Sequence, residues 1–557
     1  RRSIALSVLL AVSVALPGIA QAQSADQAVA RPTIAMRALT ADELAASRVP
    51  NYAPGHVFTW HTPDAPALHL DDFKVRDASQ SAALQQGLIR EAVVPTEQEM
   101  RLMAQFLMRN VTTRTGMPLS FSVPNKDVWR QLNPNNTVED IIERLIVTYG
   151  CSIYDAGARA AVLAALGKKL NEQSYMQEAQ KWARLLASGR SGDLETIRAF
   201  REPFRYGDER RILPRENAYF FRIIADQYLQ TDPLDGKTRW AGFPTWPDLH
   251  HEDWQPITGE NAWGPLIGPL LVDFAMYDGL IPFNVPSVQL ALSMLPGFRA
   301  MLSPIGAFYH APEGTFGRDP RDISTENNAS MFAALRMLRG VAEDNGRTEL
   351  VVELTQIMAK METYFRNYTF NPEDGTFYQG GRLTSQGFVP NRVFAVDCQT
   401  WTVSVLGPRM VDTWFGEGAA YRAWLRTKAR AGYYEGNILR GVGFTDGHEV
   451  NSGEWAMGAV RMAKDMASFY EGAHPQWASE LRADAVTMRE GVEFLKVIMP
   501  DGSIAHKYVN RSTEIPFGWR GRPIASAIVT SWVLADALGV DLFSLRKAQP
   551  PVTPIRR

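Results

Sequence analysis

Two kinds of predicted helix alternate along this chain, and the alternation limits the possible folds more than any other feature of the sequence. The first kind is amphipathic, with charges along one face, and is predicted for residues 98–113, 174–188, 286–302, 349–368, 416–430 and 477–497. The second kind is apolar on nearly every side and rich in small residues, and is predicted for residues 154–166, 260–274, 326–338, 397–407, 454–470 and 525–539. A helix that is apolar on every side is buried on every side. Six inner and six outer helices in alternation therefore predict an all-α (α/α)6 toroid of helical hairpins.

The rest of the chain is expected to surround this toroid, which we predict for residues 96–545. Residues 23–95 contain scattered Pro and only weak periodicity, so we expect an extended or irregular N-terminal segment. Residues 546–557 are predicted to be a disordered tail. Residues 216–230 are predicted to form an extra helix, inserted in the second hairpin. Strictly alternating apolar runs are almost absent, which argues against a large β-sheet.

The first 22 residues have the pattern of a secretory signal peptide. Two Arg residues precede an apolar stretch from Ile4 to Leu16, and Ala20 and Ala22 form an A-x-A cleavage site. A membrane-spanning helix needs roughly 20 apolar residues, and no later stretch provides them. We therefore expect a periplasmic or secreted protein without a membrane span after cleavage.

The balance of positive and negative side chains indicates which classes of binding partner to expect. The chain has 58 Lys and Arg residues against 60 Asp and Glu residues, and no basic run lies outside its ends. A nucleic-acid partner is therefore not expected. No motif in the sequence predicts a metal ion or a nucleotide cofactor.

The two cysteines lie at the first and fourth predicted inner helices, where Cys151 precedes Asp155 and Cys398 follows Asp397. These helices lie opposite each other in a six-membered ring. A disulfide requires Cα atoms within about 7 Å, so we expect two free thiols.

Three predicted inner helices begin with the same short pattern, a Ser or Thr two residues before a Glu. The pattern appears in TGENAWG, STENNAS and NSGEWAMG. Thr258, Ser324 and Ser452 are predicted N-caps, which would place each Glu in the first helical turn. The three acids that follow are Glu260, Glu326 and Glu454.

Two further inner helices begin with acids, Asp155 and Asp397. For a single acid, the attraction of the helix dipole, roughly 0.3–1 kcal/mol, is a sufficient explanation. The set is harder to explain in that way, because parallel inner helices bring all their N-termini to one face of the ring. Several carboxyl groups in one depression desolvate and repel one another, which raises some of their pKa values and leaves others ionised.

Aromatic and amide residues accompany these acids. The aromatic residues are Tyr154, Trp263, Trp401 and Trp455, and the amides are Asn261, Asn327, Asn328 and Gln399. Aromatic faces stack on sugar rings, and amides can bind hydroxyl groups as donors and as acceptors. The combination predicts a sugar-binding hollow, and ordinary core packing with amide caps is the simpler alternative.

Glycoside hydrolysis requires two carboxyl groups on either side of the scissile bond, about 6.5–9.5 Å apart in inverting enzymes. Glu260 and Glu454 begin the second and fifth inner helices, which face each other across the ring. We therefore predict that Glu260 is the general acid, that Glu454 is the general base, and that the configuration inverts. Asp446 and Glu449, in the loop before Glu454, are alternative bases. Glu326, Asp397 and Asp155 remain as electrostatic or hydroxyl-binding partners.

The sequence resembles the six-hairpin glycosidases, the (α/α)6-toroid superfamily that includes glucoamylase-like enzymes, endoglucanases and bacterial β-1,2-glucanases. The resemblance covers roughly residues 98–545 and rests on RTGMPLSF, YDAGARAAVLAALG, TGENAWG, STENNAS, VDCQTWTVSVLG and GRPIASAIVTSWVLADALGV. It implies catalysis by acids at the starts of inner helices and in nearby loops, with a glucan or another glycan as substrate.

Two other functions remain open from the sequence. A polysaccharide lyase or sugar epimerase on the same toroid could use Tyr309, His310, His448 and Arg520, although an acidic hollow would repel a polyanion. A non-catalytic glycan-binding scaffold is the third possibility, because a fold does not determine a function.

Overall fold

The structure is a computed structural model of the whole chain. It describes residues 94–113, 116–123, 125–188, 220–225, 229–240, 256–312, 319–517 and 519–545. The predicted signal peptide, the N-terminal segment up to residue 93 and the tail 546–557 lie outside the described residues. All of the described residues belong to one compact unit.

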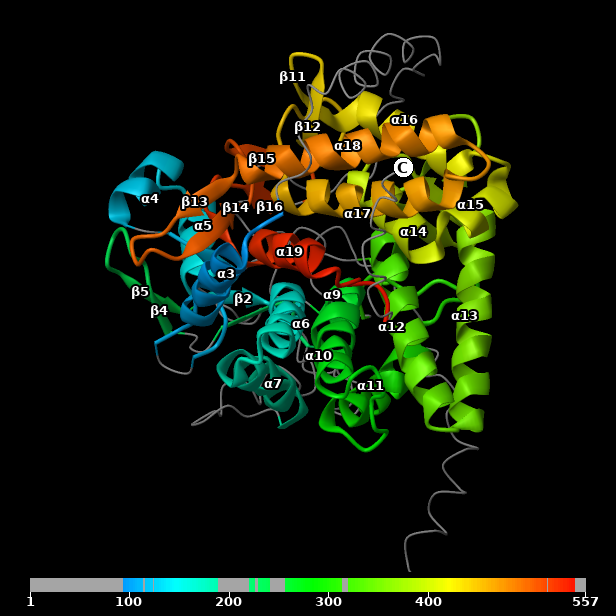
Figure 1. Cartoon of the computed structure of the whole chain (residues 1–557), viewed down its shortest axis with the longest axis horizontal. Coiled ribbons are helices and arrows are strands. Elements are labelled where there is room, and N and C mark those ends of the chain that lie inside the picture. The colour runs from blue at the N-terminus through cyan, green and yellow to red at the C-terminus, as the bar shows by residue number, and fades with distance from the viewer. Residues whose placement is uncertain are drawn as a thin grey trace, which may run out of the picture. The chain divides into compact units, whose positions relative to one another are not determined.

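The inner layer of the toroid consists of six helical stretches (Figure 1). They are α6 (Ile153–Leu170), the consecutive segments α9 (Thr258–Ala262), η5 (Trp263–Ile267) and α10 (Gly268–Met276), then α12 (Thr325–Asp344), α14 (Val396–Leu406), α17 (Gly453–Tyr470) and α19 (Ala527–Leu538). Each stretch contacts the next one in the sequence, and α19 contacts α6, which closes the ring. The predicted order of the inner helices is therefore confirmed.

Small residues allow the inner helices to approach one another closely. A Cβ atom built on Gly268 of α10 would lie 2.4 Å from the Cα atom of Gly157 in α6. No real side chain tolerates such a contact, so glycine is required at this crossing. The Ala- and Gly-rich composition of the inner helices thus follows from their packing on every side.

The outer layer consists of amphipathic helices that cover the ring. They are α3 (Glu97–Arg109), α7 (Gln173–Ser188), α11 (Pro286–Met301), α13 (Thr348–Tyr368), α16 (Ala419–Ala431) and α18 (Pro475–Glu493). Among the described residues, three shorter helices accompany them: α4 (Lys126–Leu132), α5 (Val138–Tyr149) and α15 (Pro408–Phe415). The all-α (α/α)6 class predicted from the alternation is correct.

Short antiparallel strands connect the hairpins. The largest sheet has the order β1 (Phe121–Ser122), β17 (Ala525–Ser526), β14 (Ile504–Lys507) and β13 (Lys496–Ile498), and a second has the order β10 (Gly387–Asn391), β9 (Gly380–Thr384) and β6 (Asp322–Ser324). The remaining strands form pairs: β2 (Gly150–Ser152) with β3 (Ile223–Ala225), β4 (Leu229–Thr231) with β5 (Thr238–Trp240), β7 (Phe370–Asn371) with β8 (Thr376–Phe377), β11 (Gly432–Glu435) with β12 (Ile438–Val442), and β15 (Thr513–Ile515) with β16 (Trp519–Gly521).

The helix predicted over 216–230 is wrong wherever the structure describes this segment. Ile223–Ala225 forms strand β3, which pairs with Gly150–Ser152 just before α6, and Leu229–Thr231 forms strand β4. Tertiary pairing to the start of α6 outweighs the local helical pattern, and the β-branched Ile223 and Ile224 suit a strand.

One backbone hydrogen bond recurs at all six inner helix starts. The first helical residue donates its N–H to a carbonyl in a connecting segment of the rim. The six bonds are Ile153 to Arg222, Thr258 to His310, Thr325 to Gln379, Val396 to Phe444, Gly453 to Tyr508, and Ala527 to Ser120. Each rim segment is thereby fixed against an inner helix start, where backbone N–H groups otherwise lack partners.

Two of the three predicted N-caps are confirmed. Ser324 accepts a hydrogen bond from the Asn327 N–H group, and Ser452 accepts one from the Trp455 N–H group. The prediction for Thr258 is wrong: Ile257 is the N-cap, and the Thr258 hydroxyl donates to the Tyr309 carbonyl at 2.6 Å.

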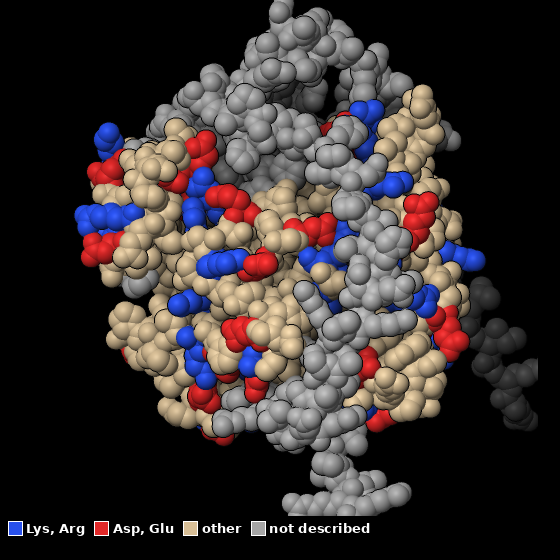
Figure 2. Space-filling model, turned by 90° about the horizontal axis from the view of Figure 1, so that it is seen from above, with Lys and Arg blue, Asp and Glu red and all other residues tan. Residues whose placement is uncertain are grey.

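Cys151 and Cys398 are buried free thiols, as predicted. No helix in the described part of the chain is long and apolar enough to cross a membrane. On the face of the molecule in Figure 2, Lys and Arg residues lie interspersed with Asp and Glu residues.

Candidate active site

The five acids at the inner helix starts lie close enough for their charges to act on one another. The negative charges of Asp397 and Glu260 act on Glu326, those of Asp155 and Asp397 act on Glu454, and that of Glu260 acts on Asp155. These interactions run around the whole ring. The structure thus brings all five carboxyl groups to one rim of the toroid, and we call them the carboxyl ring.

Burial is the main influence on four of these carboxyl groups. It raises the pKa of Asp155 and that of Asp397 to about 7, and it raises the pKa of Glu454 to about 8. The pKa of Glu326 is also raised well above its ordinary value, first by burial and then by the charge of Asp397. Carboxyl groups with such pKa values hold protons near neutral pH, as proton donors in catalysis must.

Glu260 has a different environment. Its Oε1 atom lies 2.8 Å from Nε of Arg222, and 13% of its side chain remains exposed. The Arg222 charge also acts on Asp155 and Glu326. The backbone carbonyl of Arg222 accepts the N–H group of Ile153, so the start of α6 fixes this arginine in the rim.

Two tyrosine hydroxyl groups reach Glu454. Tyr154, beside Asp155 in α6, and Tyr508, after β14, both form hydrogen bonds with its carboxyl group. Trp532 Nε1 in turn donates to the Tyr154 hydroxyl at 3.4 Å. Asp155 has a hydroxyl partner of its own in Ser120.

Three of the predicted amide ligands bind the protein backbone. The amide of Asn261 hydrogen-bonds both the N–H and the C=O group of Phe220, and Asn328 and Gln399 bind Phe308 and Phe377 in the same way. Each also donates to the carbonyl four residues before it. We call these three side chains amide clamps, because each fixes a rim segment to an inner helix start.

Asn327 differs from the amide clamps. Its Oδ1 atom accepts the N–H group of Gly259 at 2.7 Å, and its Nδ2 atom donates to Ser324 and to Glu326. This amide therefore links the start of α9 to an acid of the carboxyl ring.

The predicted aromatic residues are buried. Tyr154, Trp263 and Trp401 form one cluster with Trp532 and Phe543 across the centre of the ring, with Tyr154 stacked on Trp401 at a centroid distance of 5.8 Å. In a separate contact, Trp455 packs against Phe444 and Phe517. Core packing, the simpler alternative from the sequence, accounts for most of their surface.

The two alternative bases lie apart from the carboxyl ring. Asp446 forms two hydrogen bonds with Arg430, at 2.5 and 2.7 Å, and Arg430 also binds Asp374. Glu449 is exposed. Neither has a contact with the five acids among the described residues.

Sequence reasoning missed Arg222, Tyr508 and Ser120, which all act on the carboxyl ring. These residues occupy equivalent places in the hairpins, because each offers its backbone carbonyl to the start of an inner helix. A search for one rim residue in each hairpin would have indicated them. The prediction of a helix over 216–230 concealed Arg222.

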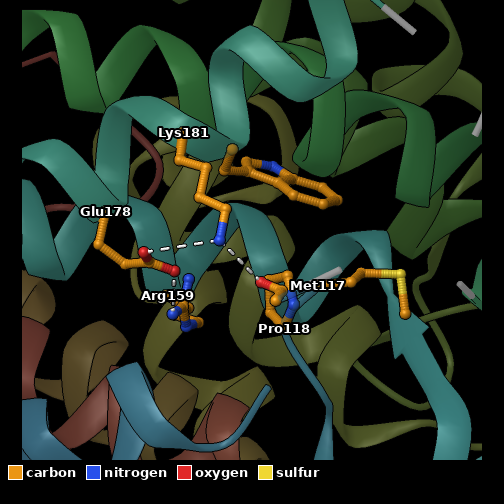
Figure 3. A pocket seen from close by; sticks show the side chains of 7 residues that line it. Met117, Pro118, Arg159, Glu178 and Lys181 are labelled. Carbon is orange, nitrogen blue, oxygen red and sulfur yellow. Dashed lines mark hydrogen bonds and ion pairs between the residues drawn. The ribbon is translucent and has the colours of Figure 1, made fainter. Parts of the chain in front are cut away.

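A small pocket lies outside the carboxyl ring, between α7 and the loop at Met117 and Pro118 (Figure 3). Its charged groups bind one another: Glu178 lies 2.8 Å from Arg159 and 3.9 Å from Lys181. These contacts stabilise the packing of α7 on α6. Among the described residues, no group of three or more His, Cys, Asp or Glu side chains is arranged to hold a metal ion.

No protein-family model matches the chain, and no curated protein sequence matches it. Solved structures do resemble it. The α-1,6-mannanase GH76A from Salegentibacter sp. HEL1_6 has a TM-score of 0.43 and 11% identity, over 79% of this chain and 98% of the mannanase.

Two other enzymes resemble the chain to the same degree. The unsaturated glucuronyl hydrolase from Bacillus sp. GL1 has a TM-score of 0.46 and 12% identity, over 80% of this chain and 96% of the hydrolase. A sugar epimerase from a ruminal bacterium has a TM-score of 0.45 and 10% identity, over 80% of this chain and 99% of the epimerase. All three are (α/α)6-toroid enzymes.

Proposed function

We propose that this protein is a glycoside hydrolase that cleaves a glucan or a related polysaccharide or oligosaccharide by paired-carboxylate catalysis. One observation carries the proposal. Glu260 and Glu454 begin opposite inner helices, and one is in an ion pair with Arg222 while burial raises the pKa of the other to about 8. Two carboxyl groups whose environments separate their protonation states are what acid–base cleavage of a glycosidic bond requires.

These environments favour the reverse of the roles predicted from the sequence. Glu454 keeps its proton near neutral pH, so we assign it as the general acid that protonates the leaving oxygen. Glu260 lies in an ion pair with Arg222, and we assign it as the general base that takes a proton from water. The water attacks the anomeric carbon from the face opposite the departing oxygen, which inverts the configuration.

The signal-peptide pattern at residues 1–22 supports a further part of the proposal, that the enzyme acts in the periplasm or outside the cell. A polymeric glycan in that compartment would meet an exported enzyme directly. Comparing the N-terminal sequence of the secreted protein with the expected cleavage after Ala22 tests this part.

The decisive experiment incubates the protein with a panel of neutral and anionic glycans and measures new reducing ends. Proton NMR of the first product then reports its anomeric configuration. We expect cleavage of a neutral glucan with inversion, and loss of cleavage in both Glu454→Gln and Glu260→Gln. A first product with retained configuration would overturn the assignment of Glu260 as a base for water.

One observation supports a lyase or an epimerase as a second candidate function. The hydroxyl groups of Tyr154 and Tyr508 lie at Glu454, and tyrosine can transfer protons in such reactions. Burial raises the pKa values of both phenols, which disfavours them as bases. Arg520, a lyase candidate from the sequence, binds Asp140 and Glu143. Unsaturated products that absorb ultraviolet light would favour the lyase, and binding without any product would favour a scaffold.

A further inference from the structure

A buried group of polar side chains lies at the end of α18, separate from the five acids of the carboxyl ring. Arg489 and Glu493 belong to this helix, and His506 belongs to strand β14. The Arg489 side chain is 2% exposed, the Glu493 side chain is 13% exposed, and the His506 side chain is fully buried. We call these three residues the α18–β14 polar group.

Six polar atoms of this group have no hydrogen-bond partner among the described residues. They are the two terminal nitrogens of Arg489, the two carboxyl oxygens of Glu493 and the two ring nitrogens of His506. Nearly all buried polar atoms in folded proteins have a partner, either in the protein or in ordered water. Six such atoms in one place therefore indicate a binding site for a small molecule.

The atoms of the group lie near one another without reaching hydrogen-bond distance. Glu493 Oε1 lies 3.6 Å from Arg489 Nη1 and 3.7 Å from His506 Nε2. On its other side, Arg489 Nε lies 3.7 Å from Oδ2 of Asp536 in α19. An N–H···O hydrogen bond is usually about 2.7–3.2 Å long. The guanidinium group thus lies near two carboxyl groups and is hydrogen-bonded to neither.

Another buried ion pair shows that such a spacing is not general in this protein. Arg144 and Asp232 are both fully buried, and their side chains approach to 2.7 Å. Opposite charges attract strongly where water is excluded. A molecule bound between Arg489 and Glu493 explains why this pair has not approached as closely.

The surrounding charges determine the class of that molecule. The positive side chains are Arg489, Lys496 of β13 and Lys464 of α17, and the negative ones are Glu493, Glu99 of α3 and Asp536. These charges balance one another. An anion would be repelled by Glu493 and a cation by Arg489, so the molecule is neutral. It must also accept a hydrogen bond from Arg489 and donate one to Glu493.

We propose that Glu493 Oε1, Arg489 Nη1 and His506 Nε2 together bind one buried water molecule. Three polar partners are the usual number for a buried water. Burial lowers the pKa of His506, so its ring is neutral near pH 7. Nitrogen Nε2 of a neutral ring either donates or accepts, and a water molecule satisfies both cases. The water would connect α18 to β14, two residues before Tyr508.

A crystal structure of the full chain, at a resolution that shows ordered water, tests the proposal directly. We expect a water oxygen within about 3.2 Å of Glu493 Oε1 and of at least one of Arg489 Nη1 and His506 Nε2. The Arg144–Asp232 pair in the same map is the control, and should be in direct contact. Absence of such a water, with Glu493 in direct contact with its neighbours, would overturn the proposal. A metal ion or an anion at this position would overturn it as well.

Two matched variants test whether Glu493 binds the water. Glu493→Gln keeps the length of the side chain and one oxygen atom, so its crystal structure should retain the water. Glu493→Met has a similar length but no oxygen, so the water should be lost. A water that stays in Glu493→Met, or one that is lost in Glu493→Gln, would contradict the assignment. If Glu493→Met does not fold, the wild-type map decides the question by itself.

The protonation of His506 can be measured in solution. The ring signals of ¹⁵N-labelled histidine report its protonation state in NMR spectra, and the spectrum of His506→Gln assigns the signals of His506. We expect a neutral ring at pH 7. A charged ring at pH 7 would overturn the proposal, because an imidazolium group would bind the Glu493 carboxylate directly.

Discussion

Glu260 and Glu454 follow the same short sequence pattern, yet the structure builds the two helix starts differently. Ser452 caps the start of α17, which then continues without interruption to Tyr470. Thr258 lies inside α9, which has five residues and passes directly into the π-helical segment η5. Pro265 within η5 has no N–H group to donate, which disrupts the regular α-helical ladder at this point.

The two starts also differ in what covers the acid. Glu454 is 7% exposed and receives the hydroxyl groups of Tyr154 and Tyr508, whereas Glu260 is in an ion pair with Arg222. The sequence pattern therefore determines where an acid begins a helix, and partners from neighbouring elements determine its charge. Roles cannot be assigned from the pattern alone.

The largest expected effect comes from removing either acid. Glu454→Gln and Glu260→Gln should each lower kcat by about 10²–10⁴-fold, the usual contribution of a general acid or base. A substrate with an activated leaving group, such as a glycosyl fluoride, needs no protonation when the bond breaks. Activity on that substrate should therefore recover in Glu454→Gln and stay low in Glu260→Gln.

The measurement is the kcat of each variant on the activated substrate and on the natural substrate. Recovery in Glu260→Gln instead of Glu454→Gln would restore the roles predicted from the sequence. Equal recovery in both variants would mean that the two acids do not have separate roles.

The next largest effect is expected on the free energy of unfolding, from a change at the start of α9, the helix that contains Glu260. Asn261 clamps Phe220, two residues before Arg222, and Asn261→Ala removes the amide that binds the buried N–H and C=O groups of Phe220. We expect a loss of about 1–3 kcal/mol in the free energy of unfolding. Denaturant titration measures this loss, and the equivalent clamp variant Gln399→Ala is the matched control.

Both clamp variants should be destabilised alike, because each clamp makes the same three hydrogen bonds. Only Asn261→Ala should also weaken catalysis, through the displacement of Arg222. Wild-type kinetics in Asn261→Ala would show that the position of Arg222 does not depend on this clamp.

The sequence was sufficient for the ring and its order. Helices that are apolar on every side must be buried, and six of them in alternation with amphipathic helices leave few arrangements other than a closed toroid. The same argument placed Cys151 and Cys398 apart and brought five acids to one rim. These features depend on periodicity, which a sequence displays directly.

The partners of the acids could not be predicted from the sequence, because they come from segments that are distant along the chain. Arg222 lies 38 positions before Glu260, and Tyr508 lies 54 positions after Glu454. Both reach their acids from rim segments that are held by backbone hydrogen bonds, for which the residue type gives no signal. The wrong helix over 216–230 has the same cause, since the pairing of β3 with β2 is tertiary.

Smaller effects are expected on the pH dependence of the reaction. Glu454 as an acid must be protonated, so kcat/KM should fall as the pH rises through about 8. The Tyr508 hydroxyl lowers the pKa of Glu454, so Tyr508→Phe should raise that pKa and move the basic limb to higher pH by about one unit. The phenyl ring preserves the contacts with Phe121 and Phe444.

Arg222→Gln is the counterpart at the other acid. It removes the ion pair with Glu260, so it should lower kcat/KM, and it should leave the basic limb near 8, because Arg222 is not among the groups that shift the pKa of Glu454. Profiles of the two variants, measured in one buffer series, should therefore differ at the basic limb. A shift of the basic limb in both variants would contradict the separate roles of Glu260 and Glu454.

The smallest effect is expected in the loop before α17. Glu449 is exposed, so Glu449→Gln should leave kcat within about twofold of the wild type and stability within about 0.5 kcal/mol. Asp446→Asn weakens the contact with Arg430, a partly exposed pair for which we expect a loss of at most about 1 kcal/mol. Reducing-end assays and denaturant titration measure both quantities. If either variant lost activity as completely as Glu260→Gln, the general base would lie in this loop. Glu260 and Glu454 would then not be the catalytic pair, although they lie on opposite inner helices.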